Sequence, residues 1–300
     1  MNIVLTGSSG FLGRIVHEKL KAKHKVLSLG RTNECSIQVK DIANISNLPA
    51  PLDEINSVIH IAGLAHVNPK DDESKMAFDK VNFEGTKSLC FWIETWTQKP
   101  DAFIFISSVS VYGLEVGSGI TENDELLGKS PYALSKIKAE QFLLKWGEKL
   151  GIRILILRLP LIVGANPPGN LGKMINAIRR GTYFSIGGGK ARKSMVLAED
   201  VANLLATCPN ISGVYNLTDG FHPSFAELES VIAKQLGKSS SLNIPILLAR
   251  LLGKVGDILP IFPVNTNIIK KITQDLTFFD LKARQNLNWN PSSVIENWRI

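Results

Sequence analysis

Cysteine is scarce in this chain and follows no motif. The 300 residues include only Cys35, Cys90 and Cys208, and no two of them have Cys-x-x-Cys spacing. This pattern predicts neither a zinc site nor a disulfide framework. We therefore expect no metal, and a reducing cytoplasm is the natural compartment for such a protein.

Long apolar runs are also missing. Residues 1–5 are too short for the hydrophobic core of a signal peptide and lead directly into a glycine turn. No run reaches membrane-spanning length. The nearest, residues 244–259, contains Arg250, Lys254 and Asp257, and its spacing predicts a helix that faces the core, with attachment to a membrane surface as the alternative. Its repeated apolar residues are Leu247, Leu248, Leu251, Leu252 and Val255.

Charge is present but not concentrated. Lysine and arginine number 34 against 27 acidic residues, which gives a formal net charge of +7. The basic residues are dispersed rather than gathered on one helix or interleaved with aromatics, so nucleic acid is not an expected partner. A moderately basic protein suits a ligand that carries phosphates.

Among the residues that are present, Tyr132 and Lys136 form a candidate acid–base pair. They stand four residues apart in residues 130–136, which read as the opening of a helix, so both side chains leave the same face. An ammonium beside a phenol favours the phenolate and lowers the phenol pKa from about 10. Such a phenol can give or take a proton, although the pair alone is common by chance.

The N-terminus supplies the context for this pair. Residues 2–6 form an apolar run, followed by Gly7, Gly10 and Gly13 and then by an amphipathic stretch over residues 11–21. A strand, a glycine turn and a helix in this order cradle a pyrophosphate between backbone amides. The spacing is Gly-x-x-Gly-x-x-Gly, not the more familiar Gly-x-Gly-x-x-Gly.

With these motifs in this order, the chain resembles the extended short-chain dehydrogenases/reductases, the family of NAD(P)-dependent nucleotide-sugar epimerases, dehydratases and reductases. The resemblance covers essentially the whole chain. It implies an α/β fold, a Rossmann-type doubly wound parallel sheet with a smaller C-terminal α/β lobe for the substrate. The implied division is a dinucleotide-binding domain over residues 1–166 and a nucleotide-sugar lobe over residues 167–300, with chain crossings between the two.

The family pattern also assigns roles to residues of this chain. The catalytic set is Ser108, Tyr132, Lys136 and the structural asparagine Asn82, with Ser107 and Ser110 as the alternatives to Ser108. Cofactor contacts are expected at Gly7, Ser9, Gly10, Phe11, Leu12, Gly13, Arg31, Asp41, Ile42, Ala62, Gly63, Tyr132 and Lys136. Substrate contacts are expected at Ser108, Asn170, Arg192 and Lys193.

The end of the second predicted strand bears on the choice of cofactor. An NAD site needs an acidic side chain about 20 residues after the glycine turn, and a 2′-phosphate needs a cation instead. This chain has Gly30 and Arg31 there. NADP(H) is therefore favoured, and NAD stays open as the alternative.

A dissociable NADPH fits a net reduction. Within the family, residues 59–67, residues 159–164 and the region after Phe279 most resemble bacterial reductases of UDP-4-keto-6-deoxy-N-acetylhexosamines in surface polysaccharide precursor synthesis. Leu161 aligns where UDP-galactose 4-epimerases carry a substrate-binding asparagine. A 4-epimerase of UDP-hexoses or UDP-N-acetylhexosamines with tightly bound NAD remains an alternative, as does a non-catalytic dinucleotide-binding regulator. A homodimer is a further expectation of the resemblance.

Overall fold

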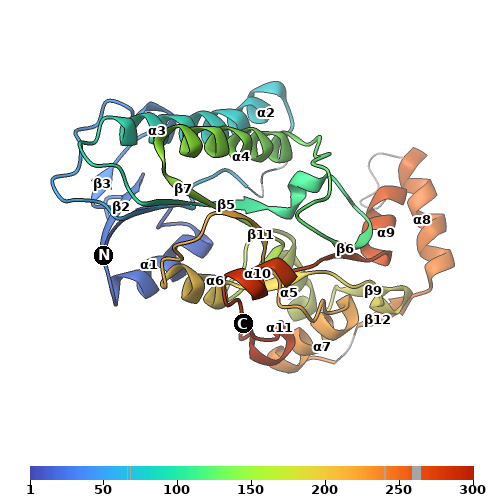
Figure 1. Cartoon of the computed structure of the whole chain (residues 1–300). Helices are drawn as coiled ribbons and strands as arrows, with labels where there is room; N and C mark the ends of the chain where they lie inside the picture. Colours follow the sequence, from blue (N-terminus) through green and yellow to red (C-terminus); the bar gives the residue numbers. More distant parts are fainter. Residues whose placement is uncertain (66, 68, 240, 259–264) are drawn as a thin grey trace.

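A seven-stranded parallel sheet forms the centre of the molecule in the computed structural model, which describes residues 1–65, 67, 69–239, 241–258 and 265–300 (Figure 1). Its strand order is β11-β7-β5-β4-β1-β2-β3. The order reverses beside β1, so the predicted doubly wound, Rossmann-type fold is confirmed. The strands are β1 (Asn2–Thr6), β2 (Lys25–Gly30), β3 (Ile37–Gln38), β4 (Ser57–His60), β5 (Ala102–Ser108), β7 (Arg153–Leu159) and β11 (Gly213–Asn216).

Helices cover both faces of this sheet, which explains why its inner strands read as nearly continuous apolar runs. Figure 1 shows α2, α3 and α4 on one face, and α1 and α6 on the other. A π-helical turn, η2 (Asp79–Glu84), joins α2 to α3. The helices are α1 (Phe11–Lys21), α2 (Asp72–Phe78), α3 (Gly85–Glu94), α4 (Pro131–Leu150) and α6 (Ala198–Leu205), and short 3₁₀ turns are η1 (Ile42–Asn44) and η3 (Val109–Tyr112).

The second half of the chain returns to the sheet. Strand β11 pairs with β7 in parallel register, from Gly213 opposite Leu155 to Asn216 opposite Arg158. Helix α6 packs against α1 in the same apolar core. Residues of the second half of the chain thus join the central sheet and its helix layer, while the division near residue 166 and the crossings between two lobes remain predictions.

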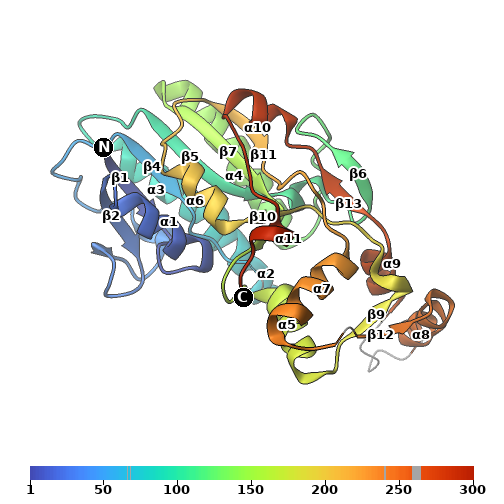
Figure 2. The same ribbon diagram turned by 90° about the horizontal axis from the view of Figure 1, so that it is seen from below.

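The smaller lobe has its own apolar core, which joins residues from residue 163 to the C-terminus. Three two-stranded parallel pairs, β8–β10, β9–β12 and β6–β13, support it (Figure 2). The other elements are β6 (Gly117–Ile120), β8 (Leu161–Val163), α5 (Gly169–Arg180), β9 (Phe184–Ile186), η4 (Gly187–Gly189), β10 (Met195–Leu197), α7 (Phe225–Leu236), β12 (Leu242–Ile244), α8 (Ile246–Ile258), α9 (Thr266–Thr273), β13 (Leu276–Phe278), α10 (Leu281–Asn286), which packs on the central sheet, and α11 (Val294–Asn297).

Helix α8 corrects one prediction. The helix forms where the apolar spacing places it, but its repeated apolar side chains do not face the core, because Ala249, Gly253 and Gly256 are the residues turned inward. Leu247 is 75% exposed and Leu251 is 60% exposed. Leu259 and His66, both in stretches quoted above, lie outside the described residues. None of the helices over the described ranges is long and apolar enough to cross a bilayer.

Candidate active site

The glycine turn after β1 has no room for side chains. Gly7 has a left-handed φ of +77°, and a Cβ there would lie 2.6 Å from the backbone nitrogen of Ala62. A Cβ on Gly13 would lie 1.9 Å from the carbonyl oxygen of Gly7. Gly10 precedes α1, and no side chain in the described part of the protein caps that helix. The first amide groups of α1 therefore remain available to a phosphate, so the turn fits a dinucleotide.

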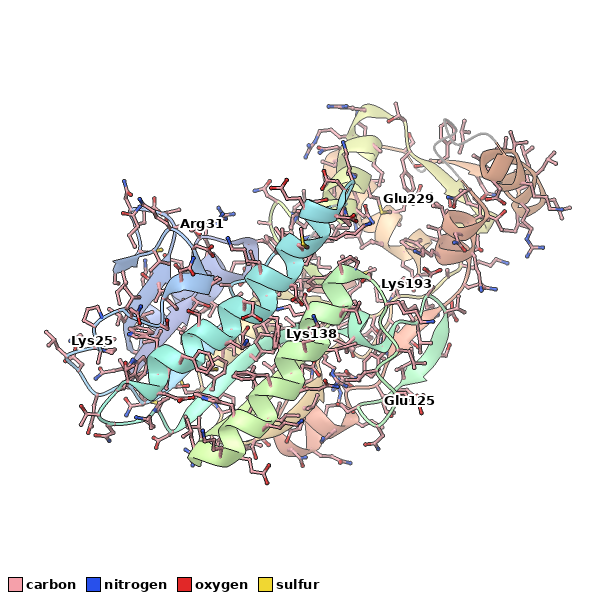
Figure 3. The ribbon with its side chains drawn as sticks, turned by 90° about the horizontal axis from the view of Figure 1, so that it is seen from above. Lys25, Arg31, Glu125, Lys138, Lys193 and Glu229 are labelled. Atoms are coloured by element: carbon pink, nitrogen blue, oxygen red, sulfur yellow. The ribbon has the colours of Figure 1, made fainter. Side chains whose placement is uncertain are left out.

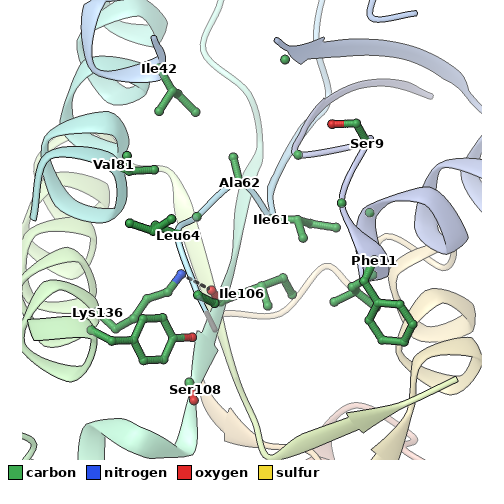
Figure 4. A pocket seen from close by; sticks show the side chains of 18 of the residues that line it. Ser9, Phe11, Ile42, Ile61, Ala62, Leu64, Val81, Ile106, Ser108 and Lys136 are labelled. Carbon is green, nitrogen blue, oxygen red and sulfur yellow. Dashed lines mark hydrogen bonds between the residues drawn. The ribbon is translucent and has the colours of Figure 1, made fainter. Parts of the chain in front are cut away.

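A cavity of about 950 Å³ extends from this turn across the carboxyl ends of the central strands. In Figure 4, Ser9 and Phe11 lie across the cavity from Leu64 and Lys136. The expected cofactor residues all line it, together with Ser108. They are Gly7, Ser9, Gly10, Phe11, Leu12, Gly13, Arg31, Asp41, Ile42, Ala62, Gly63, Tyr132 and Lys136.

One end of the cavity is basic. Arg31 lines it just after β2, and two lysines that the sequence reasoning missed, Lys40 and Lys80, line it as well. Lys80 Nζ lies 2.8 Å from Asp41 Oδ2, and this contact lowers the pKa of the Asp41 carboxyl. Asp41 is thus engaged with a cation. The only sequence signal for Lys40 at the cavity is that it directly precedes Asp41, an expected cofactor residue.

The other end of the cavity holds Ser108, Tyr132 and Lys136. Ser130 caps α4, since its hydroxyl accepts a hydrogen bond from the Ala133 amide, and Pro131 begins the helix. This start places Tyr132 and Lys136 in the first two turns, where both reach the cavity. Lys136 Nζ donates to the carbonyl oxygen of Ile106 at 2.9 Å (Figure 4).

The pKa of Tyr132 does not move in the expected direction. Burial raises the pKa of the phenol, and a hydrogen bond with Ser108 offsets part of that rise. Burial also lowers the pKa of Lys136 to about 8, against a smaller opposing effect of Glu140. The expectation that Lys136 lowers the phenol pKa is therefore wrong for this structure. A side chain with a raised pKa holds its proton at neutral pH.

Asn82 lies behind the cavity in the π-helical turn η2, where it is fully buried. Its Oδ1 accepts from the Leu64 amide at 2.6 Å, and its Nδ2 donates to the Leu64 carbonyl and to Ser135 Oγ. Asn82 thus ties the loop after β4 to α4, the helix that carries Tyr132 and Lys136. Wider turns of this kind are frequent at functional sites, but the sequence gives no periodicity signal for one.

A buried histidine, His60, is connected to Asn82 through the hydroxyl of Thr86. His60 Nδ1 lies 2.6 Å from Thr6 Oγ1, and His60 Nε2 lies 2.9 Å from Thr86 Oγ1. Because the Thr86 hydroxyl donates to the carbonyl oxygen of Asn82, His60 must donate through Nε2 and accept at Nδ1. Burial, with a smaller effect of Lys136, lowers the pKa of His60 to about 3.

A second buried network lies beside β5, the strand that ends at Ser108. The carboxylate of Glu140, one helical turn after Lys136, accepts from Arg158 and from the Ser107 hydroxyl. Ser107, one of the alternatives to Ser108, therefore bonds the buried carboxylate of Glu140. Arg158 also donates to the Tyr112 hydroxyl at 3.0 Å, which donates to Asn216 Oδ1. The network reaches from α4 to β11. Its only signal in the sequence is that Glu140 stands four residues after Lys136, on the same face of the predicted helix.

Three expected substrate residues lie outside the 950 Å³ cavity. Asn170 lines a neighbouring pocket of about 710 Å³ with Lys173 and Asn176 of α5. Arg192 donates to the carbonyl oxygen of His222, and Lys193 donates to that of Gln274. Figure 3 shows Lys193 in the smaller lobe, well away from Arg31. Their roles toward substrate remain predictions. Among the described residues, no group of three or more His, Cys, Asp or Glu side chains could hold a metal ion.

Residues 3–210 match the family model described as "NAD dependent epimerase/dehydratase family". The chain belongs to this family. A relative from Escherichia coli O157:H7, N-acetyl-alpha-D-glucosaminyl-diphospho-ditrans,octacis-undecaprenol 4-epimerase, is 27% identical over 86% of this chain and 80% of its own length. GDP-6-deoxy-D-mannose reductase from Pseudomonas aeruginosa is 29% identical over 52% of this chain and 50% of its own.

A solved structure of a human epimerase family protein with NADPH superposes with a TM-score of 0.74 at 17% identity. The match covers 97% of this chain and 95% of the human one. At that identity the likeness concerns the fold. The protein is thus an NAD(P)-dependent enzyme of the epimerase/dehydratase type, and both epimerases and reductases are among its relatives.

Proposed function

We propose that the protein is an NADPH-dependent reductase of carbon 4 in a UDP-4-keto-6-deoxy-N-acetylhexosamine, a reaction for surface polysaccharide precursor synthesis. The observation that carries the choice of cofactor is the basic end of the cavity. Arg31 lines it where an NAD site needs a carboxylate, and Lys40 adds a second cation. A guanidinium can bind a 2′-phosphate through two hydrogen bonds, whereas a carboxylate would repel it.

Tyr132 is the proton donor in the proposed reduction. NADPH, when bound, supplies the hydride that reduces the carbonyl carbon. Tyr132 then gives its proton to the oxygen at carbon 4, and the raised pKa of the phenol keeps that proton available at neutral pH. Ser108, beside the phenol, donates a hydrogen bond to the same oxygen and stabilises the developing charge.

Lys136 and Asn82 have positioning roles in this proposal. The Lys136 ammonium lies in the cavity wall, fixed by its bond to the Ile106 carbonyl, and would bind the cofactor ribose. Asn82 holds the loop at Leu64 against α4 and so keeps the cavity wall in place. The substrate diphosphate would meet Asn170, Arg192 or Lys193 from the smaller lobe.

A 4-epimerase is the second candidate function, favoured by the relative from E. coli O157:H7. That relative acts on an undecaprenyl-diphosphate-linked N-acetylglucosamine, according to its name. An epimerase would use the same Ser108, Tyr132 and Lys136 with a tightly held NAD. Leu161, which lines the cavity, offers no polar group to a sugar hydroxyl and weighs against this candidate. An intact catalytic set weighs against a non-catalytic regulator.

The deciding experiment follows the reduced nicotinamide. Given a UDP-4-keto-6-deoxy-N-acetylhexosamine, purified protein should oxidise NADPH with one new 4-hydroxyl sugar per NADPH consumed. UDP-glucose and UDP-galactose should interconvert slowly or not at all. The proposal is falsified if the protein is purified with bound NAD and equilibrates 4-epimers of a UDP-linked or polyprenyl-diphosphate-linked sugar without added cofactor.

The outer face of α3 and α4 suits the expected homodimer. Phe91, Leu134 and Leu144 are between 42% and 45% exposed there, and Phe91 packs edge-on against Phe142. Apolar helix faces of this kind are typical of two-fold contacts. Light scattering should give a dimer mass that Phe91→Glu reduces to a monomer. The three buried free thiols suit a reducing cytoplasm as the compartment.

A further inference from the structure

Helix α8 presents an apolar stripe that stays exposed against the part of the molecule that the structure describes. Leu247, Leu251 and Val255 lie at i, i+4 and i+8, with Leu248 beside them, and they are 75%, 60%, 36% and 49% exposed in that order. Isolated exposed leucines are common on proteins, but a contiguous stripe marks an interaction surface.

The opposite side of α8 is fixed to the smaller lobe. A Cβ on Gly253 would lie 3.2 Å from Ile269 of α9, so the two helices touch closely. Asp257 at the end of α8 accepts from the Thr266 amide at 3.0 Å and from its hydroxyl. Ala249 is 1% exposed on the same inner side. The stripe is therefore held outward by packing.

The charges on α8 and α9 are mostly positive. Arg250 and Lys254, one turn apart, border it, and α9 carries Lys270 and Lys271. Residues 242–273 contain these four cations and a single carboxylate, Asp257, so their net charge is +3. Asp257 is occupied by Thr266, and Lys271 is paired with Glu115 at 2.7 Å. Within the described ranges, Arg250, Lys254 and Lys270 form no ion pair, so they can meet an anionic partner.

We propose that α8 is a membrane-surface helix, which lies in the headgroup region of an anionic lipid bilayer with Leu247, Leu248, Leu251 and Val255 inserted. An apolar stripe bordered by lysine and arginine is the arrangement that binds such a surface, since long cationic side chains reach the phosphates while their stems stay apolar. A second copy of the chain fits less well, because two stripes in contact would bring Arg250 and Lys254 of both copies together without an opposing carboxylate.

The position of α8 is compatible with activity at a membrane. Figures 1 and 2 show α8 at the outer end of the smaller lobe, far from the edge of the sheet that carries β3. Attachment through α8 therefore leaves the glycine turn and the cavity free. This inference does not depend on which sugar the enzyme acts on.

Co-sedimentation of the full chain with vesicles tests the proposal. Wild type should pellet with phosphatidylcholine vesicles that contain about a quarter phosphatidylglycerol, at least ~10-fold more than with pure phosphatidylcholine, and less at high salt. Leu247→Ser with Leu251→Ser should abolish binding. Arg250→Gln with Lys254→Gln should weaken binding to the anionic vesicles and make the remaining binding less sensitive to salt. As a matched control, Leu52→Ser with Leu127→Ser, two exposed leucines elsewhere, should bind like wild type.

Folding and function are checked on the same samples. The α8 double variants should keep the wild-type unfolding midpoint and the wild-type turnover of a water-soluble substrate. Vesicle binding by the Leu247/Leu251 variant equal to that of wild type overturns the proposal, as does a wild type that stays in the supernatant. A concentration-dependent dimer that this variant loses, without any vesicle binding, would assign the stripe to a second copy instead.

Discussion

The carboxylate of Glu140 holds the guanidinium of Arg158 through both of its oxygens, at 2.7 Å for the shortest contact, while both side chains are almost completely buried. Glu140 also lies one turn beyond Lys136, and Arg158 leads to Tyr112 and Asn216. The pair and its two partners therefore connect α4, which carries Tyr132 and Lys136, to the edge strand β11.

We expect Glu140→Ala to lower the free energy of unfolding by about 3–5 kcal/mol, because it leaves a buried guanidinium without its partner. Urea unfolding measures the loss. Glu148→Ala, an exposed glutamate on the same helix, should change little. The double variant Glu140→Leu with Arg158→Met should lose less than the sum of the single changes, and equal losses for Glu140→Ala and Glu148→Ala would contradict the role of the pair.

His60 should make the protein sensitive to acid. Burial lowers the pKa of His60 to about 3 in the folded protein, whereas the unfolded chain has the ordinary histidine pKa of 6.5. As the pH falls, the unfolded state therefore binds the proton first. The contribution of His60 is fully present above pH 6.5 and is lost toward pH 3, at about 1.4 kcal/mol per pH unit.

Unfolding curves of wild type and His60→Gln over this pH range isolate that effect, since the carboxylates contribute equally to both. The variant should show the shallower dependence. His17→Gln on α1 should retain the wild-type slope. If the curves for wild type and His60→Gln run parallel, the buried imidazole is not the acid-sensitive group.

Tyr132→Phe should reduce turnover by at least about 100-fold, because it removes the proton donor and preserves the shape of the ring. Steady-state kinetics and NADPH titration together check this, and the affinity for NADPH should change little. Tyr183→Phe in the smaller lobe is the matched control. Near-normal turnover in Tyr132→Phe would transfer the acid role to another group, with Ser108 the first to examine.

Arg31→Ala should weaken NADPH binding by about 1.5–3 kcal/mol, the range for a hydrogen bond to a charged group, and leave NADH binding nearly unchanged. Titration of both nucleotides into both proteins gives the difference. Lys25→Ala, which removes an exposed cation at the start of β2, should alter neither affinity. Equal losses for the two nucleotides would show that Arg31 does not read the 2′-phosphate.

The sequence predicts the sheet and the glycine turn well, because both rest on local patterns. An apolar strand, three glycines and an amphipathic helix specify the start of the fold, and Ser130 with Pro131 specifies the start of the catalytic helix. These local signals bring Gly7, Ser108, Tyr132 and Lys136 to one cavity, as the order of motifs implies.

The sequence does not reveal what depends on distant contacts. Asn82 in the π-helical turn forms hydrogen bonds with Leu64 and Ser135, which are 18 and 53 residues away in the chain. The pKa of Tyr132 depends on burial, so the spacing to Lys136 misled the prediction. Helix α8 has the periodicity of a core helix, and periodicity alone cannot tell whether an apolar face meets the core or the outside.

The return of β11 and α6 to the sheet has a consequence for biosynthesis. The apolar face that α1 shares with Val201, Leu205 and Tyr215 cannot be covered before the ribosome has made most of the chain. A nascent chain that ends near residue 197 would expose this face, and pulse proteolysis should find it cleavable where the finished protein resists. We therefore expect a chaperone to bind this exposed apolar face during translation, because the residues that cover α1 are synthesised long after α1 itself.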